Sequence, residues 1–113
     1  MIPIIIISDF ICELFSVFIR VGGITLYPFI VLRKEWNNKT TINHEKIHIE
    51  QQKELLVIFF YILYVYYWLK GKIKGLSNHE AYMSIPFEKE AYENEDNFNY
   101  LKSRKKWNWI KFI

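Results

Sequence analysis

The sequence of 113 residues contains little cysteine, glycine and proline, and it has no strong excess of either charge. Cys12 is its one cysteine, which excludes intramolecular disulfides and any metal site that needs two thiolates from one chain. The formal net charge of +3 is too small to argue for nucleic-acid binding, and no nucleic-acid motif accompanies the basic residues. The amino-terminal apolar stretch also lacks the preceding positive charge and the small-residue cleavage site of a secretory signal.

Apolar and aromatic residues are abundant instead. They make up 51% and 19% of the chain, and the aromatic share is high for a soluble domain of this length. A small domain has little interior in which to bury so many rings. We therefore expect part of the apolar surface to contact lipid, a partner or a second copy of the chain.

The hydrophobic pattern predicts one domain over residues 1–113, with an α+β, mostly α fold and a small β-sheet or hairpin. Pro28 would lie in an edge strand or at a bulge, since it removes one backbone donor. Pro86 is suited to the first turn of a helix. The expected elements are an apolar helix over residues 8–20, a strand over 24–33, a long helix of roughly 40 Å over 42–70 and a later acidic helix over 87–103.

The long predicted helix begins with the sequence NHEKIHIEQQ, which contains the pattern HExxH. His44 and His48 are four residues apart, so their imidazoles project from one helix face and can bind one metal ion. Glu45 follows the first histidine directly, where its carboxylate can take a proton from a water at the metal. The pattern therefore predicts a zinc site with a catalytic base.

A catalytic zinc site needs a third protein ligand and one open position. No histidine stands six residues after His48, since that position is Glu54. The candidates that remain are His79 and the carboxylates of PFEKEAYENED, among which Glu88, Glu90 and Glu95 stay open on spacing alone.

HExxH followed by a separate helix with Glu-x-x-Ala resembles the gluzincin clan of zinc metallopeptidases. In length the chain is similar to the minigluzincins, which are peptidases reduced to the catalytic core, and it also resembles short bacterial proteins with the same two segments. The resemblance covers roughly residues 24–100 and implies a zincin-like core in which Glu88 is the third zinc ligand. Tyr92 stands where the family has an aspartate that orients a zinc-bound histidine, and Glu95 could orient a ligand instead.

The transition state of peptide hydrolysis needs a hydrogen-bond donor aimed at the developing negative charge. The candidates that the sequence offers for this role are Tyr82, Tyr92, Tyr100 and His79.

Residues 55–69 read LLVIFFYILYVYYWL and contain no charge. This run would span about 22 Å of helix, which is shorter than the hydrocarbon core of about 30 Å. Its tyrosines and tryptophan favour a membrane interface, and Lys70, Lys72 and Lys74 could reach lipid phosphates. We expect shallow membrane association at the cytoplasmic face. The alternatives are burial against the amino-terminal helix with dimerisation, a true membrane span, and a soluble cytoplasmic protein.

The sequence thus predicts a membrane-associated zinc metallopeptidase whose partners are a peptide or protein substrate and a membrane surface, without nucleic acid. The ligands of Zn²⁺ would be His44, His48 and Glu88, with Glu45 as general base. The first alternative is a catalytically silent membrane-associated or interaction protein that keeps a zincin-like fold, which Tyr92 favours. The second is a metal-free apolar interaction module in which the HExxH pattern is a coincidence.

Overall fold

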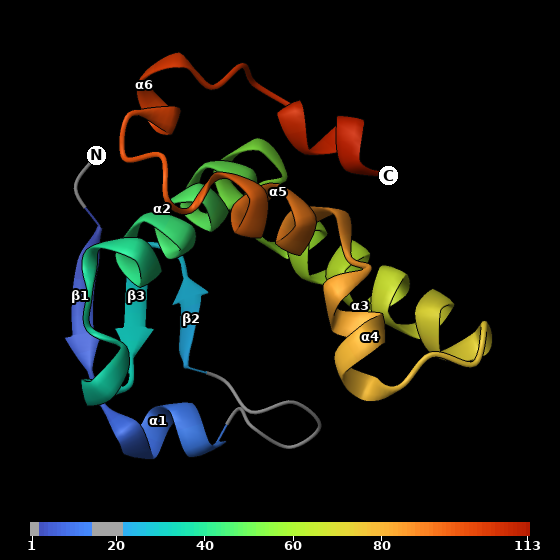
Figure 1. Ribbon diagram of the computed structural model, residues 1–113, viewed down its shortest axis with the longest axis horizontal. Helices are drawn as coiled ribbons and strands as arrows, with labels where there is room; N and C mark the ends of the chain where they lie inside the picture. The colour runs from blue at the N-terminus through green and yellow to red at the C-terminus, as the bar shows by residue number, and fades with distance from the viewer. Residues whose placement is uncertain (1–2, 15–21) are drawn as a thin grey trace.

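A computed structural model describes residues 3–14 and 22–113 of the chain. It is mainly helical with one small three-stranded mixed sheet, so the predicted α+β, mostly α class is confirmed (Figure 1). In chain order the elements are β1 (Ile4–Ile7), α1 (Asp9–Leu14), β2 (Gly23–Leu26), β3 (Phe29–Leu32), a 3₁₀ turn (Lys34–Trp36), α2 (Lys39–Glu54), α3 (Ile58–Ile73), α4 (Asn78–Met83), α5 (Pro86–Asn94), α6 (Tyr100–Ser103) and a carboxyl-terminal 3₁₀ helix (Asn108–Phe112).

The sheet has the strand order β1-β3-β2, with β1 parallel and β2 antiparallel to β3. The prediction of one strand over 24–33 is wrong, because this segment folds into the hairpin of β2 and β3. Pro28 lies in the two-residue turn between them, where the lack of an N–H costs no ladder hydrogen bond. The isoleucine run of residues 4–7 forms β1, a strand that was not predicted.

The apolar helix expected over 8–20 is present as α1 in the described residues, and its predicted part over 15–20 lies outside them. Ser8 Oγ accepts a 3.2 Å hydrogen bond from the backbone N–H of Ile11, as a capping side chain would. The next predicted helix begins earlier than expected. Its cap is Asn38, whose side chain accepts from the N–H of Thr41 at 2.8 Å.

The single helix predicted over 42–70 is wrong. The chain forms α2 and α3, which meet at a bend of 112°. Leu56 and Val57 turn the backbone with φ values of 53° and 64°, although neither is a glycine. The sequence gives no local signal for this turn, because only tertiary packing stabilises a conformation that such side chains disfavour. The bend allows the aromatic face of α3 to pack on α5, which a straight helix of that length could not do.

The acidic helix predicted over 87–103 is also shorter than expected. It begins at Pro86, as the proline predicted, but α5 ends at Asn94 and the separate helix α6 follows. Asn43 of α2 binds backbone carbonyls at the end of α5. Its side-chain amide thereby donates to carbonyl groups that would otherwise accept hydrogen bonds from the next helical turn, which helps to end the helix there.

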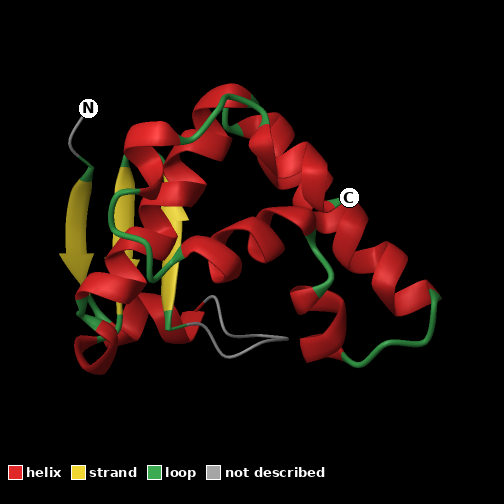
Figure 2. Cartoon of the chain, turned by 45° about the horizontal axis from the view of Figure 1, so that its top comes forward, coloured by secondary structure: helices red, strands yellow, loops and turns green. Residues whose placement is uncertain are grey.

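The helix α2 occupies the middle of the molecule, between the sheet and α5 (Figure 2). On the sheet side, Ile49 packs with Ile30 and Leu32 of β3. A second apolar cluster forms where α3, α5 and the carboxyl-terminal segment meet, and it contains Phe60, Ile85, Phe87 and Trp109. Burial of α2 on two sides encloses the polar residues that it carries.

Candidate metal centre

The two histidines of the HExxH sequence project from α2 toward α5. The Nε2 atoms of His44 and His48 are 3.2 Å apart, and the rings meet edge to face with centroids 4.9 Å apart. Both side chains are buried, with residue exposures of 7% and 4%, because α2 is covered on two sides. The two ring nitrogens therefore face each other inside the protein.

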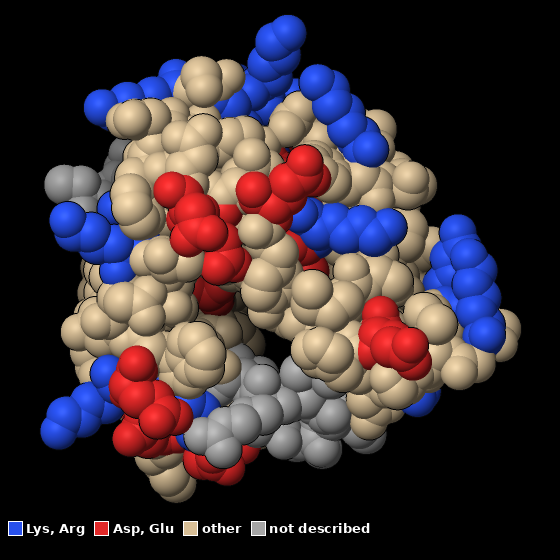
Figure 3. All heavy atoms as spheres, in the orientation of Figure 1, with Lys and Arg blue, Asp and Glu red and all other residues tan. Residues whose placement is uncertain are grey.

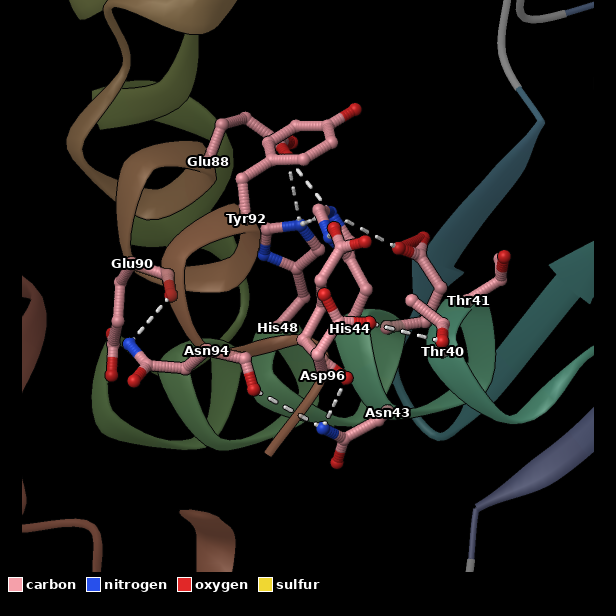
Figure 4. A network of polar contacts seen from close by, with 12 residues as sticks. Thr40, Thr41, Asn43, His44, His48, Glu88, Glu90, Tyr92, Asn94 and Asp96 are labelled. Carbon is pink, nitrogen blue, oxygen red and sulfur yellow. Dashed lines mark hydrogen bonds and ion pairs between the residues drawn. The ribbon is translucent and has the colours of Figure 1, made fainter. Parts of the chain in front are cut away.

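Glu88 in the first turn of α5 completes a triangle of ligand atoms with these histidines (Figure 4). Its Oε1 atom lies 3.0 Å from His44 Nε2 and 3.2 Å from His48 Nε2. Ligand atoms placed tetrahedrally at about 2.0–2.1 Å from a zinc ion are about 3.3 Å from one another. The three atoms therefore already have nearly the mutual spacing that a single zinc ion requires.

Gln51 fixes the tautomer of His48. The Gln51 Nε2 group donates to the Phe87 carbonyl at 3.1 Å and to Glu90 Oε1 at 2.9 Å, which turns Gln51 Oε1 toward His48 Nδ1 at 2.7 Å. An amide oxygen can only accept, so His48 Nδ1 carries the hydrogen. In the neutral ring, Nε2 then presents its lone pair to the triangle.

Glu95 orients His44 in the same way, since its Oε1 atom lies 3.0 Å from His44 Nδ1. The side-chain amide of Asn43 holds the segment that carries Glu95. It donates to the carbonyls of Asn94, Glu95 and Asn97 at 3.3, 2.8 and 3.1 Å. The residue directly before the HExxH sequence thus positions the acceptor for its first histidine.

Tyr92 does not take the place of the aspartate that the resemblance implies. Its ring meets the ring of His44 edge to face, with centroids 4.5 Å apart, and its hydroxyl lies 2.8 Å from the Tyr82 hydroxyl. Glu95, one helical turn later, is the side chain that contacts His44 Nδ1. A carboxylate therefore orients His44 even though position 92 is a tyrosine.

The triangle strongly favours positive charge. Burial lowers the pKa of His44, but hydrogen bonds with Glu88 and Glu95 outweigh it and raise that pKa to about 10. Burial also lowers the pKa of His48, and the charge of Glu88 reverses this effect to give a raised value. For Glu88, burial raises the pKa, but the two imidazoles hold it well below its ordinary value. The centre therefore stabilises cations, whether protons or a metal ion.

Glu45 lies beside the ligand triangle. Its Oε2 atom is 3.7 Å from His44 Nε2, and the ligand atoms of His44, Glu45 and His48 all lie within 4.8 Å of one another. These three residues could thus hold a metal ion together. Glu88 could equally supply a ligand, because its Oε1 atom is within 3.2 Å of both imidazoles.

The environment of Glu45 suits proton transfer. Burial raises the pKa of its carboxyl group, although His48 and His44 lower it. A carboxylate with a raised pKa holds a transferred proton more readily near neutral pH. The adjacent strand lies close at this point, because a Cβ atom added to Gly23 would lie 2.7 Å from Leu32 Cδ2 and 3.6 Å from Glu45 Cδ.

The outer edge of β2 runs past Glu45. The backbone N–H of Arg33 donates to the Gly22 carbonyl, so Gly22 faces β3. Residues of an antiparallel strand alternate in direction, and the backbone N–H and carbonyl groups of Gly23 and Thr25 therefore point away from β3. The Thr25 carbonyl accepts from Gln52 Nε2 at 2.9 Å and from the Tyr61 hydroxyl at 2.6 Å. Thr25 also contacts Glu45 directly, because its Oγ1 donates to the Glu45 carbonyl at 3.0 Å.

Two tyrosines bind the carboxylate of Glu88. Tyr64 of α3 donates to its Oε2 atom at 2.7 Å, and Tyr82 of α4 donates to its Oε1 atom at 3.2 Å. Burial, followed by the charge of Glu88, raises the pKa of each phenol far above its ordinary value. Both hydroxyls therefore remain protonated donors at physiological pH.

Of the predicted oxyanion donors, Tyr82 and Tyr92 lie at this centre and the other two do not. Tyr100 donates to Glu90 Oε2 at 2.6 Å, away from the triangle. His79 is exposed on α4 and contacts Tyr82 through its ring, with centroids 6.1 Å apart. His79 is thus not among the side chains that meet the HExxH histidines.

Glu90 belongs to a buried ion-pair network. Arg104 binds its two oxygens through Nε at 2.6 Å and Nη2 at 3.1 Å, and it binds Glu54 Oε2 through Nη1 at 2.7 Å. Burial raises the pKa of Glu90, but Arg104 and the neighbouring hydrogen bonds lower it below the ordinary value. Glu90 thus holds the carboxyl-terminal segment against α2 and α5.

The donor set of two imidazoles, one carboxylate and held Nδ1 atoms fits a zinc ion. Sequence reasoning missed the residues that hold these ligands, Asn43, Gln51 and Tyr64. The amides that flank the HExxH sequence were a usable signal, because Asn43 and Gln51 lie on the same helix as the histidines. No protein-family model, curated protein or solved structure matches this chain.

Proposed function

We propose that this chain is a zinc-dependent metallopeptidase with a minimal zincin-like core, in which His44, His48 and Glu88 bind the ion. The observation that carries the proposal is a buried triangle of two Nε2 atoms and one carboxylate oxygen, with sides of 3.0, 3.2 and 3.2 Å. Two imidazole nitrogens and a carboxylate oxygen approach one another this closely when a proton or a metal ion lies between them. Two histidines and a glutamate are also an established ligand set for catalytic zinc.

Zinc held by these residues supplies a Lewis acid that lowers the pKa of water to about 7. Glu45 lies next to His44 and outside the triangle, so its carboxylate can accept a proton from the attacking water and return it to the leaving amine. The Tyr82 hydroxyl lies 3.2 Å from Glu88 Oε1 and 2.8 Å from the Tyr92 hydroxyl, and it would turn its hydrogen from Glu88 toward the developing negative oxygen of the substrate.

The substrate would be an extended peptide that pairs with the outer edge of β2. The backbone groups of Gly23 point outward beside Glu45, so a peptide pairing there brings a carbonyl to the base.

A catalytically silent protein that keeps the metal centre is the second candidate. It is favoured by the contacts that Gln52 and Tyr61 make to the Thr25 carbonyl, because they occupy an acceptor that an added peptide strand would use. The two candidates share the metal centre and differ in whether peptide is hydrolysed.

The proposal is tested by metal analysis and peptide cleavage with the full chain. Wild type should purify with close to one zinc per chain, and His44→Ala should lose it. Glu45→Gln should retain zinc and lose cleavage of a mixed peptide library. Glu50→Gln is the matched control, because Glu50 is also on α2 but pairs at the surface with Lys53 at 3.2 Å.

Zinc retained with no cleavage by wild type would favour the silent protein. Cleavage that persists in Glu45→Gln would refute Glu45 as the base. A wild type that binds no zinc under any buffer condition would refute both candidates.

A further inference from the structure

The outward face of α3 carries a continuous apolar stripe, which we call the α3 stripe. Its members recur at helical spacing and are exposed, and they are Ile58, Phe59, Ile62, Val65, Tyr66, Leu69 and Ile73. Ile73 is 87% exposed and Ile62 is 58% exposed. Within the parts of the chain that the structure describes, no other element covers this face, whereas the opposite face of α3 packs on Phe87.

Basic residues border the end of the α3 stripe. Lys70, Lys72 and Lys74 lie on or directly after the last turn of α3, and residues 55–79 contain no aspartate or glutamate. Lys70 and Lys74 line a cavity of about 150 Å³ together with Lys89. Figure 3 shows lysine or arginine side chains over the end of α3, at the right of the view. Apolar and cationic surfaces are thus adjacent.

The length of α3 sets how it can meet a bilayer. Its 16 residues correspond to about 24 Å, less than the hydrocarbon thickness of about 30 Å. Among the described residues, no single helix is long and apolar enough to cross a membrane. Only α2 and α3 taken together have the required length and composition, and they are bent by 112°. A helix with one apolar face and one packed face suits the plane of the interface.

We propose that α3 lies in the plane of an anionic phospholipid membrane, with the α3 stripe among the acyl chains and Lys70, Lys72 and Lys74 on lipid phosphates. Charge decides between a bilayer and a second copy of the chain. A second copy that covered the stripe with its own stripe would offer these lysines no carboxylate from residues 55–79, whereas anionic headgroups neutralise them.

This placement sets the distance between the membrane and the metal centre. From the inner face of α3, Tyr64 donates to Glu88 at 2.7 Å and Tyr61 donates to the Thr25 carbonyl at 2.6 Å. One helix of about 10 Å diameter therefore separates the lipid from these groups. A peptide segment close to the bilayer surface could reach the edge of β2.

The test is vesicle flotation of the full chain. The vesicles contain either phosphatidylcholine alone or equal parts of phosphatidylcholine and phosphatidylglycerol. Wild type should float with the anionic vesicles and much less with the neutral ones. The double variant Ile62→Asp with Val65→Asp should stay at the bottom of the gradient. Phe98→Asp is the matched control, since Phe98 is 54% exposed but lies outside the α3 stripe.

The lysines are tested separately by the triple variant Lys70→Gln, Lys72→Gln and Lys74→Gln. Each lysine near an anionic surface contributes about fivefold, so the triple variant should bind anionic vesicles on the order of 100-fold more weakly. Circular dichroism checks that each variant is folded. Two results would overturn the proposal. One is wild type that binds neither kind of vesicle and has the molar mass of a dimer in light scattering. The other is binding that the lysine substitutions leave unchanged.

Discussion

Gln51 Oε1 accepts a 2.7 Å hydrogen bond from His48 Nδ1, and this contact links the metal centre to a buried ion-pair network. The same side chain donates to Glu90, whose carboxylate is held by Arg104. The orientation of His48 therefore depends on side chains that never touch the ligand triangle. Such outer contacts commonly determine how tightly a metal is held.

Replacing Gln51 by methionine should weaken zinc binding about 10- to 100-fold, because methionine fills a similar volume without a strong acceptor for His48 Nδ1. Competition with a chromophoric chelator measures the affinity. Glu50→Gln, at the half-exposed residue one position earlier on α2, should bind zinc as wild type does. Equal affinity for Gln51→Met and wild type would show that the contact does not matter for the metal.

Glu95→Ala should have a comparable effect through the other histidine. The substitution removes the acceptor 3.0 Å from His44 Nδ1, so the ring loses its fixed orientation and zinc affinity should fall about 10- to 100-fold. Glu93→Ala is the control, because Glu93 lies on the exposed side of the same helix. A loss of affinity in both variants would point instead to the general charge of α5.

Zinc binding should release at least one proton near neutral pH. The pKa of His44 is raised to about 10, so the metal-free ring is protonated there, whereas a zinc-bound imidazole must be neutral at Nε2. The apparent zinc affinity should therefore rise about tenfold per pH unit for each displaced proton, up to the pKa of His44. Calorimetry in buffers with different ionisation enthalpies counts the protons.

The same raised pKa makes the stability of the metal-free protein depend on pH. A group whose folded pKa lies above its unfolded value stabilises the fold fully below the ordinary value of 6.5, and this contribution is lost as the pH rises to about 10. Urea unfolding of the metal-free protein should thus need less urea as the pH increases across this window. Zinc-loaded protein should lack this decline, and a decline in both forms would place the titrating group elsewhere.

The sequence predicted the HExxH residues and the acidic segment that meets them, because helical spacing alone puts His44 and His48 on one face. It could not choose among Glu88, Glu90 and Glu95. All three carboxylates lie within eight residues, and their separate roles depend on which side of α5 faces α2. In the structure Glu88 meets the imidazole Nε2 atoms, Glu95 meets Nδ1, and Glu90 meets Arg104.

The mostly helical fold could also be predicted, but the bend between α2 and α3 could not. Leu56 and Val57 are apolar residues in an apolar run, and periodicity gives no break without glycine or proline. The hairpin could not be predicted for a related reason, since Pro28 is compatible with an edge strand as well as with a turn. In both places packing between distant segments decides the local conformation.

Arg104→Met should lower the free energy of unfolding by about 3–5 kcal/mol, because it leaves the buried carboxylates of Glu54 and Glu90 without their common partner. Urea denaturation of the zinc-loaded protein measures the loss. The triple variant Arg104→Met, Glu54→Gln, Glu90→Gln should recover part of it, since no buried charge is then unpaired. A single variant as stable as wild type would mean that the network contributes little.

Val57→Gly should raise the free energy of unfolding by about 1 kcal/mol. Val57 has φ 64° and ψ −59°, a strained γ-turn conformation that costs a β-branched side chain at least about 1 kcal/mol and that glycine tolerates better. Val65→Gly, in the middle of α3 and on its exposed face, should instead lower it by about 1 kcal/mol, because glycine costs entropy within a helix. Chemical denaturation of both variants gives the two signs directly. If Val57→Gly destabilises the protein as much as Val65→Gly does, the backbone at residue 57 is helical in solution and α2 continues into α3 without a bend.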